Sequence, residues 1–291
     1  MPDATAGKVP IFECVRLAWM FLIEHWRLFL PAAGIVGVVS QLGPLFAYMT
    51  APANAAPQSA LQAGLGDLLI SAPAALAGVL FTAAILRKAV RNEFHGPTGL
   101  AFGADEVRLL GASLALMCLF VPLITLVAVV LFITVFSKIA TSEAALQTLL
   151  ADPEAMNEAI LKALGETGAA ALSLFILVVL ALFVLLAARF YMINAATIGE
   201  KRIVLFQTWS WSRGNILRMI GAMILTVLPV MLIDSVVADL LRTIVPATAG
   251  VAPVLVVSTI VSFVAAMTTI PVVALGAIFY KGLRPPDFVA K

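Results

Sequence analysis

Charged residues are scarce in this chain of 291 amino acids. Asp, Glu, Lys and Arg make up 12% of the residues, whereas a soluble domain has about 25%. A soluble fold of this length could not bury the 62% of residues that are hydrophobic, so a soluble domain and a disordered chain are both excluded. The formal net charge of +2 is too small to indicate a nucleic-acid partner.

Residues that carry site chemistry are equally scarce. Two cysteines and two histidines are too few for a disulfide framework or a cysteine-rich metal site. No Ser, His and Asp set indicates a catalytic triad, and no glycine-rich loop indicates a phosphate cradle. The close carboxylates Asp105 and Glu106 are interpreted as a solvated interface rather than as an acid–base pair. We therefore expect no enzyme, no cofactor and no metal.

Long runs without a charged residue are what the chain has instead. Crossing roughly 30 Å of hydrocarbon takes about 20 mostly apolar residues in a helix. These runs predict an all-α, polytopic membrane protein whose residues 1–291 form a single transmembrane domain. Six spanning helices are expected at 28–49, 67–87, 108–136, 167–192, 216–240 and 252–280.

Lysine and arginine are distributed unevenly between the two sides that six helices would separate. Fifteen of the 18 lie in the two tails and in the second and fourth connections. Because cytoplasmic segments carry the Lys and Arg excess, we predict that both termini, 88–107 and 199–215 are cytoplasmic. Residues 50–66 and 138–166 are then outside, and the location is a bacterial inner membrane.

The four tryptophans fall on the same predicted side as the basic residues. Their expected role is an aromatic belt at the cytoplasmic interface, where amphipathic rings are favoured. A stacking site for a ligand is the alternative. The residues are Trp19, Trp26, Trp209 and Trp211.

Two cytoplasmic segments, 1–27 and 199–215, are expected to hold short interfacial helices. In 10–26, apolar residues recur at spacings of three and four, and charged residues occupy the other side. Such a helix lies in the plane of the interface. The segment 199–213 is similar but less regular, and Gly214 is placed to end it.

An arginine precedes the first, third and fifth predicted spans, as Arg27, Arg108 and Arg218. This recurrence predicts a loose repeat of three two-helix units. The alternative is that arginine at a cytoplasmic helix end reaches the interface wherever it occurs.

The outer loop 138–166 is the one sizeable segment expected outside the membrane. Asp152 and Pro153 suit a helix cap and first turn, and Gly165 suits a helix end. We expect a short acidic helix over the outer surface, and a ligand lid is the alternative.

Polar residues inside the apolar spans are functional candidates. Asp234 lies 16 residues beyond Arg218, which is about 24 Å along a helix and near the outer boundary. An outer polar cluster with Asp239 and Arg242 is one interpretation, and a proton or substrate site is the other. Gln41 is interpreted as a residue that joins helices by a hydrogen bond.

Residues 189–214 carry a pattern of a known family. Arg189-Phe190-Tyr191 is followed by Gly199-Glu200 and then by Trp211-Ser212-Arg213-Gly214. This resembles the membrane domain of glycerophosphodiester phosphodiesterases and related orphan bacterial inner-membrane proteins. There, a helix ends in Arg plus aromatic or apolar residues, and a Glu-Gly-type turn leads to Ser-x-x-[Lys/Arg]-Gly. Here the Gly-Glu order is reversed and the second motif is compressed.

The resemblance implies a membrane module of unassigned function. The family's catalytic barrel follows its membrane domain, and this chain has eleven residues after Tyr280, so we expect no counterpart of the catalytic residues. The leading hypothesis is a non-catalytic module that binds membrane lipids, another membrane protein or a second copy through its cytoplasmic interfacial helices. A small transporter or permease for an apolar or lipid-like substrate is the alternative. The candidate functional or interface residues are Asp234, Gln41, Arg189, Trp209, Trp211 and Arg213.

Overall fold

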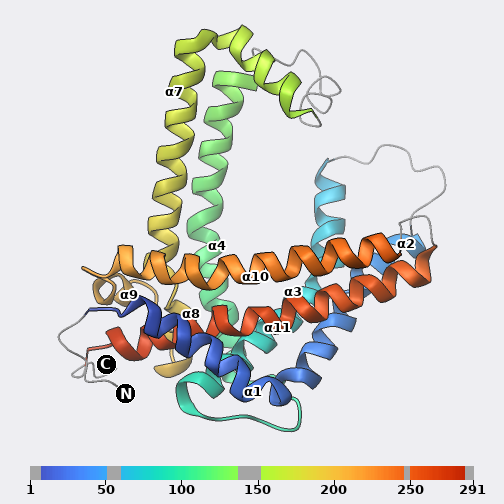
Figure 1. The fold of residues 1–291 in the computed structure, drawn as a ribbon, viewed down its shortest axis with the longest axis vertical. Coiled ribbons are helices and arrows are strands. Elements are labelled where there is room, and N and C mark those ends of the chain that lie inside the picture. The colour runs from blue at the N-terminus through green and yellow to red at the C-terminus, as the bar shows by residue number, and fades with distance from the viewer. Residues whose placement is uncertain (1–7, 51–59, 137–151, 246–249, 286–291) are drawn as a thin grey trace. The chain divides into compact units, whose positions relative to one another are not determined.

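A computed structural model describes residues 8–50, 60–136, 152–245 and 250–285, and these residues contain helices and turns but no strand. The helices are α1 (Ile11–Val39), α2 (Leu42–Thr50), α3 (Ala60–Arg91), α4 (Ala104–Leu131), the π-helical η1 (Phe132–Phe136), α7 (Pro153–Phe190), α8 (Ile193–Gly199), α9 (Gln207–Trp211), α10 (Ile216–Ile244) and α11 (Val251–Leu283) (Figure 1). Within these residues, six helical segments are long and apolar enough to cross a membrane. The predicted all-α class with six spanning helices is confirmed.

The first helix differs from the prediction. Residues 10–26 were expected to form an interfacial helix separate from the span at 28–49, but α1 continues from Ile11 to Val39 without interruption. The charged residues Glu24 and Arg27 are exposed on its surface, so they end an apolar run without ending the helix. The break comes instead at Ser40, whose hydroxyl donates a hydrogen bond to the Val36 carbonyl at 2.7 Å.

The segment 199–215 holds much less helix than expected. Apart from Gly199, the last residue of α8, only Gln207–Trp211 is helical, as α9. Gly214 has a φ of 80° and lies in the turn before α10, but α9 already ends at Trp211 with Ser212 as its C-cap, so the prediction that this glycine ends the helix is wrong. The short helix α8, which the sequence did not indicate, lies between α7 and this segment, and five of its seven residues are buried.

The predicted helix in the outer loop is present with both of its ends. The Asp152 carboxylate accepts hydrogen bonds from the backbone N–H groups of Glu154 and Ala155, at 3.0 and 3.1 Å. Gly165 has a φ of 68° and a ψ of 174°, which interrupts α7 at the predicted stop. Residues 138–151 of that loop lie outside the described part of the chain.

The described helices form two compact units. Unit 1 comprises residues 1–112 and 188–291, and unit 2 comprises residues 113–187. In unit 2, the Phe120 and Phe183 rings stack with their centroids 6.2 Å apart. The most apolar windows of α4 and α7 contain no buried residue, so these helices offer their side chains to hydrocarbon or to another protein.

Helices from both ends of the chain build the core of unit 1. Helix α1 packs along α11, and α3, α8 and α10 pack against this pair (Figure 1). A Cβ at Gly37 would lie 3.1 Å from the Thr259 carbonyl oxygen, so this glycine allows α1 and α11 to approach closely. Helices of the first and third predicted two-helix units are therefore packed together, and the repeat itself stays a prediction.

Candidate functional site

A buried arginine marks the end of α3. Only 2% of the Arg87 surface and 1% of the Glu106 surface are exposed, and the two side chains form an ion pair. The Arg87 guanidinium also donates to the Gly99 carbonyl at 2.9 Å. These contacts join α3, the 92–103 loop and α4 at one point. Because an unpaired buried charge is strongly destabilising, the three elements are expected to stay together there.

Arg91 lies one helical turn beyond Arg87 and extends the ion-pair network. Its guanidinium pairs with Asp105 and, at 3.1 Å, with Glu93. The Asp105 carboxylate also accepts from Arg108 at 3.0 Å. A further Arg91 N–H donates to the Ile198 carbonyl at 3.3 Å, which ties the network to the end of α8.

The polarity of the helix ends explains why these charges meet. A helix C-terminus favours cations, and α3 ends with basic side chains. A helix N-terminus favours anions, and α4 begins with Asp105 and Glu106 in its first turn. The 92–103 loop can fold back on itself because Gly99 has no Cβ. A Cβ at this position would lie 2.5 Å from the Phe94 ring.

The interpretation of Asp105 and Glu106 as a solvated interface is therefore wrong. Arg87 and Arg91 are four residues apart on one face of α3, and they cover both carboxylates. The sequence does contain a pattern that indicates these ion pairs. Two basic residues at this spacing are followed, after a glycine-containing loop, by two acidic residues. Which arginine meets which carboxylate depends on the path of the loop between α3 and α4, and the sequence pattern does not give that path.

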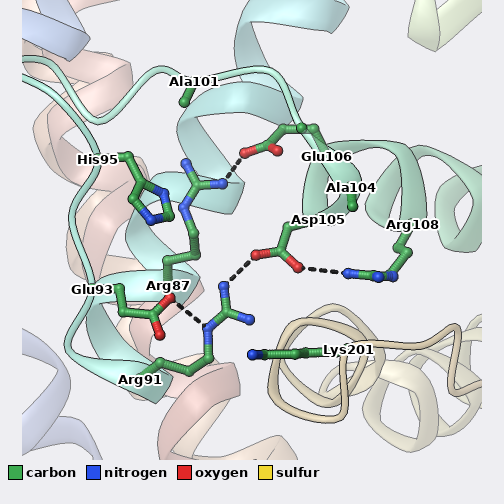
Figure 2. A pocket seen from close by; sticks show the side chains of 11 residues that line it. Arg87, Arg91, Glu93, His95, Ala101, Ala104, Asp105, Glu106, Arg108 and Lys201 are labelled. Atoms are coloured by element: carbon green, nitrogen blue, oxygen red, sulfur yellow. Dashed lines mark hydrogen bonds and ion pairs between the residues drawn. The ribbon is translucent and has the colours of Figure 1, made fainter.

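A cavity of about 260 Å³ lies beside this network (Figure 2). Four cationic side chains, three carboxylates and His95 line it, together with small residues of the 101–104 segment. One of the cations, Lys201, comes from the turn after α8 and has a φ of 52°. Figure 2 shows its side chain extending from that turn toward Arg91 and Asp105. We call this the charged cavity.

A second buried carboxylate lies in the same turn as Lys201. The Glu200 side chain is 4% exposed, and it accepts a hydrogen bond from the Tyr280 hydroxyl at 2.6 Å. The Arg284 guanidinium forms an ion pair with it at 2.6 Å. A Cβ at Gly199 would lie 2.5 Å from the Tyr280 hydroxyl oxygen, which gives the Gly199-Glu200 order a structural reason.

Two of the predicted site residues, Arg189 and Trp209, come together. The Arg189 guanidinium donates to the Trp209 carbonyl at 2.7 Å and lies 4.7 Å from the centre of its ring. Trp209 is 42% exposed and Phe206 67% exposed, so an aromatic surface lies beside this arginine. Arg213 is exposed nearby in the chain, in the turn before α10.

Trp211 does not belong to an exposed belt, and that prediction is corrected. Its side chain is buried, with its ring centre 6.1 Å from that of Tyr280. Successive residues of the short helix α9 point in different directions, so Trp209 is exposed while Trp211 packs into the core.

The other two predicted site residues join helices away from the charged cavity. The Gln41 amide donates to the Ser262 hydroxyl on α11 at 3.0 Å, in agreement with its predicted role. Asp234 is half-buried and accepts from the Thr268 hydroxyl on α11 at 2.8 Å. Asp239 and Arg242 are both exposed, and in the described structure they form no ion pair with each other.

The charged cavity contains more hydrogen-bond donors than its own carboxylates occupy. All three carboxylates that line it are ion-paired to arginines. Within the residues that the structure describes, no group of three or more His, Cys, Asp or Glu is arranged to hold a metal ion. The cationic side chains are the groups with hydrogen-bond donors to spare.

Comparisons with known proteins give no match that assigns a role to this cavity. The chain matches no protein-family model, no curated protein and no solved structure. The resemblance of residues 189–214 to the phosphodiesterase membrane domain therefore stays a prediction from the sequence.

Proposed function

We propose that this chain is a non-catalytic module of the bacterial inner membrane that binds membrane lipids at a basic, cytoplasmic end of unit 1. The observation that carries the proposal is the contact between Arg189 and the exposed Trp209. The exposed Phe206 ring packs against Phe190, as the Trp209 ring does. Exposed aromatic rings next to arginine are typical of side chains at the headgroup level. The proposal also includes the resemblance of residues 189–214 to the membrane domain of the glycerophosphodiester phosphodiesterase family.

Contacts within unit 1 support a common side for the segments predicted to be cytoplasmic. Arg91 donates to Ile198, and Lys201 lines the same cavity as the 92–103 loop. Glu200 binds Arg284, just after the end of α11. The connection from α3 to α4, the connection from α8 to α10 and the end of α11 are therefore neighbours, as a shared membrane face requires.

Native mass spectrometry of the protein, released from its own membrane in mild detergent, tests lipid binding. We expect anionic phospholipids to remain bound to the wild type and their occupancy to fall several-fold in the Arg189→Ala and Trp209→Ala variants. The control is Arg242→Ala, since Arg242 is an exposed arginine near the other end of α10.

Equal losses in Arg189→Ala and Arg242→Ala would show that any surface arginine has this effect and would count against the proposal. A wild type that retains no lipid at all would remove its basis.

A small transporter for an apolar or lipid-like substrate is the second candidate function. The observation that favours it is the half-buried Asp234 between α10 and α11, because ionisable residues within spanning helices often mark substrate or proton paths. Neutralising this residue separates the two functions.

A further inference from the structure

One cationic side chain of the charged cavity, Lys201, takes no part in the ion pairs there. Each of the three carboxylates that line it is bound to an arginine. The pairs are Glu106–Arg87, Asp105–Arg91, Asp105–Arg108 and Glu93–Arg91. Lys201 lines the same cavity, and within the described chain its ammonium group has no hydrogen bond or ion pair. The lining thus has four cationic side chains and three carboxylates.

Lys201 is held at this position by its neighbours in the chain. The preceding residue, Glu200, is fixed by Tyr280 and Arg284. The Lys201 backbone has a φ of 52°, a conformation that side-chain-bearing residues adopt uncommonly. These two features fix the backbone from which the exposed Lys201 side chain extends toward Arg91 (Figure 2).

The arginines of the cavity also have donors to spare. A guanidinium has five N–H donors. Arg108 donates to Asp105 and keeps a side chain that is 32% exposed. The Nε–H of the buried Arg87 has no hydrogen-bond partner among the described residues. Arg87 is itself buried, so the donors that a ligand in the cavity can reach are those of Lys201 and Arg108, two like charges that an anion would stabilise.

We propose that the charged cavity binds a phosphate group, with the Lys201 ammonium as its main contact and Arg108 as the second. Phosphate offers several acceptor oxygens and a charge of one or two, which matches a lysine beside an arginine fork. A volume of about 260 Å³ is below the roughly 300–1,000 Å³ of drug-sized ligand sites. The cavity therefore suits a headgroup or a free phosphate compound, without acyl chains.

This inference rests on the proposed function only for the source of the phosphate. If the module binds lipids, the ligand is the headgroup of an anionic phospholipid. If it does not, the same contacts serve inorganic phosphate or a soluble phosphate monoester. The recognising chemistry is the same in both cases.

Lysine acylation followed by mass spectrometry tests the site in the unmodified chain. The protein is placed in nanodiscs of phosphatidylcholine, and acylation rates are measured with added inorganic phosphate, with glycerol 3-phosphate, or with phosphatidic acid in the bilayer. We expect at least one ligand to slow acylation of Lys201 about tenfold, as a charged hydrogen bond would. Lys88, whose ammonium donates to Asn92 at 2.7 Å outside the cavity, is the internal control.

A matched pair of variants tests the same contact by affinity. Lys201→Gln should weaken binding of the protecting ligand by about tenfold or more. Lys88→Gln removes the same charge outside the cavity and should change it by less than about twofold. The proposal is overturned if none of the three ligands slows acylation of Lys201, or if each slows Lys88 equally.

The two proposals fail differently. If phospholipids co-purify with the protein but no ligand protects Lys201, the cavity inference is wrong and lipid binding stands. If inorganic phosphate protects Lys201 and no lipid co-purifies, the cavity binds a soluble ligand and the lipid-binding function is wrong.

Discussion

At the scale of single residues, the pair formed by Arg87 and Glu106 shows how a charge is accommodated in an apolar chain. Both side chains are almost fully buried, and the Gly99 carbonyl takes a further arginine N–H. Removing both ions from water is expensive, and their attraction compensates only while both partners are present. The pair is therefore expected to be sensitive to the loss of either charge.

Glu106→Gln removes one charge and leaves Arg87 buried without its counter-ion. We expect the free energy of unfolding in detergent micelles to fall by about 3–5 kcal/mol, measured by chemical denaturation. The double variant Arg87→Met with Glu106→Leu removes both charges and should recover most of that loss.

The control for this variant is Glu13→Gln in the exposed pair of Arg16 and Glu13 on α1, whose atoms are 2.7 Å apart. Water screens an exposed pair, so this change should cost much less stability than Glu106→Gln. Similar losses in Glu106→Gln and Glu13→Gln would contradict the role assigned to the buried pair.

Asp234 is the residue that separates a lipid-binding module from a transporter. Asp234→Asn keeps an oxygen that can accept from the Thr268 hydroxyl, so only the charge is lost. Because Asp234 is half-buried near the predicted outer boundary, we expect stability to change by less than about 1 kcal/mol. We also expect the variant to rescue any phenotype of a deletion strain.

Expression level and rescue should be measured together, with Thr268→Val as the matched variant that removes the hydrogen bond but no charge. Failure of Asp234→Asn to rescue at a normal protein level, with rescue by Thr268→Val, would favour the transporter function.

At the scale of helices, the sequence predicted most of what depends on neighbouring residues and little of what depends on packing. Asp152 and Gly165 were recognised because a cap and a stop act within one turn. The continuity of α1 was missed because Glu24 and Arg27 end an apolar run but not a helix. The charged cavity was missed because it requires the ends of α3 and α4 and the turn at Lys201 to meet.

The contact of α8 with α11 gives a prediction at this scale. A methyl group at Gly199 would collide with the Tyr280 ring and hydroxyl, which are 2.5–2.6 Å from the position of its Cβ. Gly199→Ala should therefore lower the free energy of unfolding by about 1–3 kcal/mol, the usual cost of overpacking. Thermal unfolding in detergent measures this effect.

Gly282→Ala is the matched control because no atom lies within 4 Å of the position of its Cβ. Alanine favours helix over glycine, so this change should be neutral or slightly stabilising. If both variants unfold at the wild-type temperature, α8 and α11 are not packed as described.

At the scale of the whole molecule, α4 gives the clearest test of the predicted sidedness of the chain. Helix α4 and η1 form one apolar segment from Ala104 to Val135, long enough to cross a membrane once. The 92–103 loop precedes this segment, and the helix capped by Asp152 follows it. We therefore predict that these two places lie on opposite sides of the membrane, with the arginine-rich loop on the cytoplasmic side.

Cysteine labelling in intact cells tests this topology. In a background in which Cys14 and Cys118 are replaced by alanine, we expect a membrane-impermeant maleimide to label Asn157→Cys at once and Asn92→Cys only after lysis. Both asparagines are exposed, so a difference in labelling reports sidedness rather than burial. The reverse pattern would place Lys201 and the charged cavity on the outer face. Labelling of both positions in intact cells would mean that α4 does not cross the membrane.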